Sequence, residues 1–157
     1  LMILGAQLIG MTSIMQKQAN IPLSDAQPSV LYITQGSFGI MRTVELRDDT
    51  LYYAATCNSV PVAIDRLNPK RWQSFRQTLE FLQAEQWQPK YFNPNVLDGQ
   101  QWEVKIAYAD GRLIESRGSN AYPGLLDTDY TIYGSESLDW RLFTCALAWL
   151  TDGRWIR

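Results

Sequence analysis

The chain contains no histidine among its 157 residues, and this limits the chemistry that its side chains could do. Histidine is the most common general base and a frequent zinc ligand, and Ser-His-Asp and Cys-His arrangements require it. No serine and lysine have the S-x-x-K spacing that activates a nucleophile without histidine. We therefore expect a protein that is not an enzyme, with an enzyme of unfamiliar type as the less favoured alternative.

Aspartates and glycine-rich turns are the remaining candidates for metal or phosphate chemistry. Asp127 and Asp129 match a fragment of a calcium-binding loop, but the glycine and the distal glutamate of that loop are missing. Asp48 and Asp110 fall in predicted turns, where aspartate is common for structural reasons. Residues 36–39 (GSFG) lack the GK[ST] ending of a phosphate loop. The sequence predicts no metal site and no cofactor.

Residues 118–123 (GSNAYP) are the best candidate for a binding site, because loops at strand ends often carry function. Their hydroxyl and amide groups could hold a partner's backbone or a small polar ligand. A structural interpretation remains open, since asparagine tolerates left-handed backbone geometry and its amide can bond the turn. Nearby aromatic residues extend the candidate because exposed tyrosine, tryptophan and arginine anchor protein interfaces. The predicted binding residues are Ser119, Asn120, Tyr122, Tyr91, Phe92 and Tyr130.

The predicted strands and turns determine where these candidate residues lie. Residues 30–35, 40–47 and 51–57 read as three strands, with a turn or bulge at 36–39 and a turn at Asp48 and Asp49. Residues 101–108 alternate between apolar and polar side chains, and residues 112–117 return along them. Asp110 and Gly111 between them favour a two-residue type I′ turn.

Two helices are predicted. Asn68 and Pro69 form a helix start, and the helix extends to about Gln86 with Trp72, Phe75, Leu79 and Leu82 on one apolar face. Ser135 or Ser137 begins a second helix that Gly153 ends. Apolar residues recur in it at helical spacing: Leu138, Leu142, Cys145 or Ala146, and Trp149.

The element order predicts an α+β fold: a four- to five-stranded antiparallel sheet with two helices packed on one face, in the order ββ(β)αββα. Residues 30–157 form the predicted single domain. Residues 1–29 form an apolar N-terminal segment and a linker. The first fifteen residues are too short for a membrane-spanning helix. They are interpreted as a signal-like or appended segment, or as an arm that packs on the domain or on a second copy, giving a homo-oligomer.

The net charge of −2 and the lack of a basic run argue against nucleic acid as a partner. Cys57 and Cys145 are too far apart for a CxxC motif. They are either two reduced thiols, in keeping with the cytoplasm, or one disulfide, which would place the protein in the periplasm or outside the cell.

One stretch of the chain resembles a known group of sequences. It runs from Asp98 and Gly99 through the strand residues Trp102, Val104, Ile106 and Tyr108 to Asp110, Gly111 and Arg112, and on to Ser116 and the GSNAYP block. It is similar to a family of small bacterial proteins and lipoprotein domains without an established activity. The opening GSFG is similar to the same proteins. The resemblance, over about residues 30–150, implies the fold and a bacterial origin rather than a function.

Composition and the missing catalytic groups favour a non-catalytic protein-binding domain, with an inhibitor or immunity-type protein as the concrete form. The alternative is an exported envelope domain that binds a peptide or glycan.

Overall fold

The computed structural model describes residues 27–64, 68–124 and 136–155 of the chain. Their elements, in chain order, are β1 (Val30–Ser37), β2 (Ile40–Arg47), β3 (Thr50–Ala54), β4 (Val62–Ala63), α2 (Pro69–Phe81), the 3-10 helix η2 (Ala84–Gln86), β5 (Lys90–Phe92), β6 (Gln101–Ala107), β7 (Leu113–Ser119) and α3 (Leu138–Leu150).

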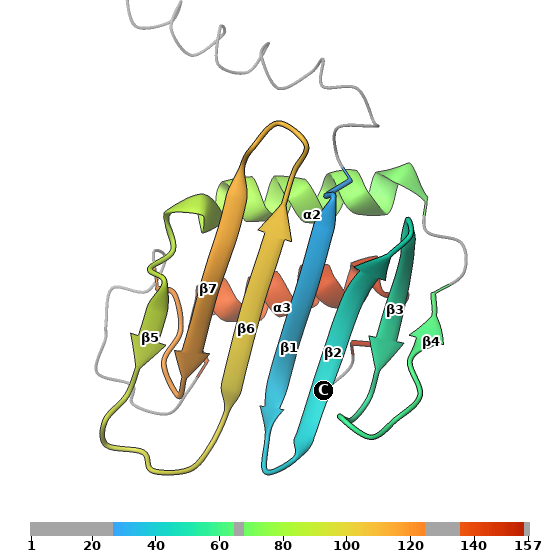
Figure 1. Cartoon of the computed structure of the whole chain (residues 1–157). Helices are drawn as coiled ribbons and strands as arrows, with labels where there is room; N and C mark the ends of the chain where they lie inside the picture. Colours follow the sequence, from blue (N-terminus) through green and yellow to red (C-terminus); the bar gives the residue numbers. More distant parts are fainter. Residues whose placement is uncertain (1–26, 65–67, 125–135, 156–157) are drawn as a thin grey trace, which may run out of the picture.

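The strands form one seven-stranded sheet in the order β4-β3-β2-β1-β6-β7-β5. Helices α2 and α3 both lie against one face of it, and neither helix covers the other face (Figure 1). The α+β class with two helices is confirmed. The prediction of four to five antiparallel strands is only partly right, because the sheet has two further edge strands and β5 runs parallel to β7. These edge strands, β4 and β5, have two and three residues, too few for an alternating pattern.

Two-residue turns join the first three strands. Phe38 and Gly39 have φ angles of 49° and 80°, and Asp48 and Asp49 have 46° and 61°. Positive φ at both central residues is what a type I′ turn needs, and this turn matches the twist of the strands that it joins.

The β6–β7 hairpin differs from the predicted type I′ turn. The Tyr108 amide donates to the Arg112 carbonyl, so three residues rather than two lie between them. Of these three, only Gly111 has a positive φ, at 88°. A three-residue loop places its glycine in the last position, which is where the left-handed conformation is required.

Helix α2 begins as its sequence predicts. The Asn68 side chain accepts a hydrogen bond from the Arg71 amide at 3.1 Å, and Pro69 occupies the first turn. The predicted apolar face is buried: Trp72, Phe75, Leu79 and Leu82. The helix ends before Gln83, whose φ of 49° is left-handed, and η2 follows.

Helix α3 is confirmed, but the residues whose spacing predicts it do not form its buried face. Ser137 caps it by accepting from the Trp140 amide at 3.1 Å, and Trp140, Phe143, Leu147 and Leu150 are buried. Leu138, Leu142, Cys145 and Trp149 are exposed, and Ala146, the alternative to Cys145, is half-buried against the core. Since the helix is apolar on both faces, spacing alone could not choose between them.

Candidate binding surfaces

The parallel pairing of β5 with β7 gathers most of the predicted binding residues at one end of the sheet. Tyr91 lies opposite Gly118, and Phe92 lies opposite Ser119. Asn120 and Tyr122 follow directly after β7. The structure thus brings five predicted residues from two distant segments to one end of the sheet, whereas Tyr130 lies outside the described residues.

Tyr91 and Tyr122 belong to an aromatic cluster of the core. The Tyr91 ring centroid lies 5.8 Å from that of Trp102, and its hydroxyl accepts a hydrogen bond from the Gln88 amide at 3.0 Å. The Tyr122 ring stacks on Trp102 and lies 5.4 Å from Trp140. Burial, and then the Glu136 carboxylate, raises the pKa of Tyr122 to about 12. Both tyrosines therefore contribute mainly to packing.

Asn120 closes the loop that precedes β6. Its φ of 51° is left-handed, its amide N–H donates to the Gln100 carbonyl, and its side-chain oxygen accepts from the Gln100 amide, both at 2.9 Å. A Cβ on Gly99 would lie 2.1 Å from that oxygen, so glycine is needed there. These contacts support the structural interpretation of Asn120.

Ser119 and Phe92 are the predicted residues that face away from the helices. The Ser119 hydroxyl accepts from the Gln101 side chain at 2.8 Å, and the Phe92 side chain is 58% exposed. The Lys90 ammonium lies 5.4 Å from the Phe92 ring centroid. Arg117, opposite Lys90 in the ladder, is exposed on the same face. We call Lys90, Phe92, Arg117 and Ser119 the Phe92 surface. The predicted site did not include Lys90 and Arg117, although side chains alternate along a strand and those of Lys90 and Arg117 therefore share a face with Phe92 and Ser119.

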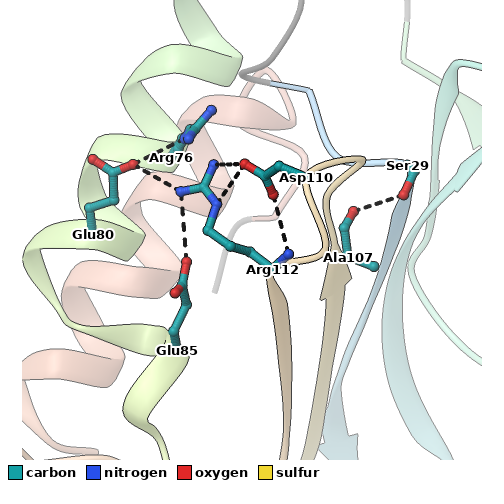
Figure 2. Close-up of polar contacts among 7 residues, drawn as sticks. All are labelled: Ser29, Arg76, Glu80, Glu85, Ala107, Asp110 and Arg112. Atoms are coloured by element: carbon teal, nitrogen blue, oxygen red, sulfur yellow. Dashed lines mark hydrogen bonds and ion pairs between the residues drawn. The ribbon is translucent and has the colours of Figure 1, made fainter. Parts of the chain in front are cut away.

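The densest group of charged side chains connects α2 to the β6–β7 hairpin (Figure 2). The Arg112 guanidinium lies 2.7 Å from an Asp110 carboxylate oxygen and 3.5 Å and 3.7 Å from those of Glu80 and Glu85. Arg76 binds Glu80 at 3.0 Å. Each of the three carboxylates is thus paired with an arginine.

Tyr108 lies beneath this group of charges. The Arg76 and Arg112 guanidinium carbons lie 5.4 Å and 5.0 Å from its ring centroid. Burial raises the pKa of the Tyr108 hydroxyl well above its usual value, although the nearby Arg76 charge opposes this rise. The arrangement ties the hairpin to the helix and is structural.

The exposed face of α3 carries an apolar line that we call the α3 stripe: Leu138, Leu142, Cys145 and Trp149. Steps of four, three and four residues place these side chains along one side of the helix, the spacing of a helix–helix seam. Trp149 is 59% exposed, with the Arg71 guanidinium 5.3 Å from its ring centroid. Their helical spacing is visible in the sequence, but their exposure is not.

Metal, redox and membrane features can be assessed within the described part of the chain. No group of three or more Cys, Asp or Glu residues there could hold a metal ion. Asp127 and Asp129 lie outside it. Cys57 and Cys145 are free and exposed, so the structure contains no disulfide between them to support export. None of the helices in residues 27–64, 68–124 and 136–155 is long and apolar enough to cross a membrane.

Comparison with protein-family models, with curated proteins and with solved structures gives no match in any of the three sets. The resemblance through the GSNAYP block therefore stays a prediction, and the function has to be argued from the surfaces described above.

Proposed function

We propose that the protein is a non-catalytic protein-binding domain, of the inhibitor or immunity type, and that its partner docks on the α3 stripe. The observation that carries the proposal is the exposure of Leu138, Leu142 and Trp149 in one line on a helix whose opposite face fills the core. Apolar residues grouped in this way on a surface are typical of an interaction site, whereas single exposed apolar residues are common everywhere.

The stripe is better suited to a protein interface than the Phe92 surface is. The centre of an interface is apolar and poor in charge, and tryptophan is among its strongest anchors. The α3 stripe offers four apolar side chains that include Trp149, with Arg71 and Arg141 beside them, whereas the Phe92 surface offers a single apolar side chain with Lys90 and Arg117 beside it. We therefore assign the Phe92 surface a secondary role at most.

The partner's chemistry follows from the stripe and its neighbours. Residues at coiled-coil spacing fit an amphipathic helix that presents apolar residues at the same spacing. Arg141, on the same side of α3, is exposed and makes no side-chain ion pair with the described residues. An acidic residue beside the apolar face of the partner helix would complement this charge.

The test compares three variants as bait for proteins from the source cells. Leu142→Glu places a charge in the middle of the stripe, and Leu113→Glu makes the same change at an exposed leucine of β7, which is 49% exposed against 36% for Leu142. Phe92→Glu alters the Phe92 surface. We expect a stoichiometric partner that Leu113→Glu and Phe92→Glu retain and that Leu142→Glu loses.

Two results would overturn the proposal. A partner lost with Phe92→Glu and retained with Leu142→Glu would move the interface to the Phe92 surface. A purified protein that forms a dimer by light scattering, and becomes a monomer with Leu142→Glu, would show that a second copy occupies the stripe instead of a different protein.

A further inference from the structure

A groove separates α3 from the β1–β2 turn on the helix-covered side of the sheet. It has a volume of about 490 Å³, within the range of small-molecule sites. Ser37 and Ile40 line it from the turn, Ala148 from α3, and Trp155 from the segment after α3. The groove thus combines an apolar wall with polar groups, and Cys145 is the one residue of the α3 stripe that lines it.

Arg42 supplies the positive charge of this groove. It pairs with Gln35 across β1 and β2, and both side chains lie on the helix-covered side because they alternate with the buried residues Ile33 and Val44. Arg42 is half-buried, and its guanidinium makes no hydrogen bond or ion pair with any residue in the described part of the chain. The other arginines there that are buried or half-buried each pair with a carboxylate: Arg71, Arg76 and Arg112.

Glu136 defines the second polar group of the ligand. The Gln35 side-chain amide donates to its carboxylate at 3.0 Å, which holds Glu136 at the groove, and no ion pair joins it to Arg42. A guanidinium binds a carboxylate with two parallel hydrogen bonds, whereas a carboxylate accepts from an N–H group. A ligand that satisfies both has a carboxylate and an N–H donor close together.

We propose that this groove binds the carboxylate of an α-amino-acid unit through Arg42, with the amino nitrogen toward Glu136 and an apolar side chain against Ile40, Ala148 and Trp155. The unit is either a free amino acid or the C-terminal residue of a peptide, which share this chemistry. The inference does not depend on the α3 stripe or on any protein partner.

Calorimetric titration of the full chain with three probes tests this assignment. L-Leucine has a carboxylate and an ammonium, N-acetyl-L-leucine has a carboxylate and an amide N–H, and L-leucinamide lacks the carboxylate. We expect L-leucine, N-acetyl-L-leucine or both to bind, and L-leucinamide not to bind. Tighter binding of L-leucine identifies a free amino acid, and tighter binding of N-acetyl-L-leucine identifies a peptide C-terminus. The proposal is overturned if neither L-leucine nor N-acetyl-L-leucine binds, or if L-leucinamide binds as tightly as they do.

Matched variants show whether the groove is responsible. Arg42→Gln should weaken carboxylate binding by roughly ten- to a hundredfold, the usual effect of losing a charged hydrogen-bonding partner. Arg47→Gln, the same change at an exposed arginine of the same strand, should leave it unchanged. Ala148→Leu fills the groove and leaves Arg42 in place, and it should abolish binding of the carboxylate probes. Unchanged binding in Arg42→Gln contradicts the assignment, and so does equal weakening by Arg47→Gln.

Discussion

Gly118 lies directly opposite Trp102 in the β6–β7 ladder, and the Trp102 indole occupies the space where a side chain at position 118 would be. A Cβ there would lie 2.1 Å from the indole Nε1, which donates to the Ala121 carbonyl at 2.9 Å. The same indole lies 4.4 Å, centroid to centroid, from Trp140 of α3. Gly118 thus allows the aromatic cluster to join the sheet to the helix.

Replacing Gly118 with alanine should destabilise the protein. The added methyl group must displace Trp102, and overpacking of this kind costs about 1–3 kcal/mol. Urea unfolding followed by tryptophan fluorescence measures the change. Gly111→Ala is the contrasting variant because no atom lies within 4 Å of its added Cβ, although its φ of 88° still strains alanine. Equal stability of Gly118→Ala and wild type would show that Trp102 moves aside freely.

Asn120→Ala should reduce stability rather than binding. It removes the hydrogen bond to the Gln100 amide and places alanine at a left-handed φ, and the two effects together cost about 2 kcal/mol. Asn120→Gly keeps the backbone geometry and should lose about 1 kcal/mol. Thermal unfolding of both variants separates the two contributions. A melting temperature equal to that of wild type in Asn120→Ala would instead support a binding role for this loop.

Arg112→Gln should lower the free energy of unfolding by about 1–2 kcal/mol, because Arg112 joins Asp110, Glu80 and Glu85 and is only 27% exposed. Lys105→Gln is the control. The pair of Lys105 with Glu115 is more exposed, at 45% and 56%, and such pairs contribute about 0–1 kcal/mol. Chemical unfolding in low salt compares them. A loss in Lys105→Gln as large as in Arg112→Gln would count against a special role for the Arg112 group.

Stability at alkaline pH should depend on Tyr122. Burial raises the pKa of Tyr122 to about 12, from about 10 in an unfolded chain. The unfolded state therefore loses its proton first, and the free energy of unfolding falls as pH rises from about 10 to about 12. Tyr122→Phe lacks this proton and should lose less stability between pH 8 and pH 11. Urea unfolding at both pH values tests this, and an equal fall in both proteins would exclude a contribution from Tyr122.

Local sequence signals were sufficient for the long strands and for α2. The alternation over 101–107 and the Asn68–Pro69 start describe elements whose neighbours lie close in sequence. The short strand β5 could not be predicted in this way, because three residues carry no pattern and its parallel pairing with β7 arises only after the chain has folded. The seven-stranded sheet therefore depends on contacts that no local pattern describes.

The predicted binding site stays a prediction, and residue type alone could not decide it. Composition marked Tyr91, Asn120 and Tyr122 as possible contacts, yet their side chains pack on Trp102 or close a loop. Tyrosine and asparagine serve packing and binding equally well, so residue type does not separate the two roles. On α3, two apolar faces have helical spacing, and only the position of the sheet determines which face is buried.

Protection of the native thiols tests the central claim, that the partner docks on the α3 stripe, most directly. Cys145 lies within the stripe, whereas Cys57 is exposed near the β1–β2 turn, where its thiol donates to the Gly39 carbonyl at 2.9 Å. Maleimide labelling rates of both thiols are measured with and without the captured partner. Docking on the α3 stripe should slow labelling of Cys145 at least tenfold and leave labelling of Cys57 unchanged. Equal labelling of Cys145 in the free protein and in the complex would contradict it.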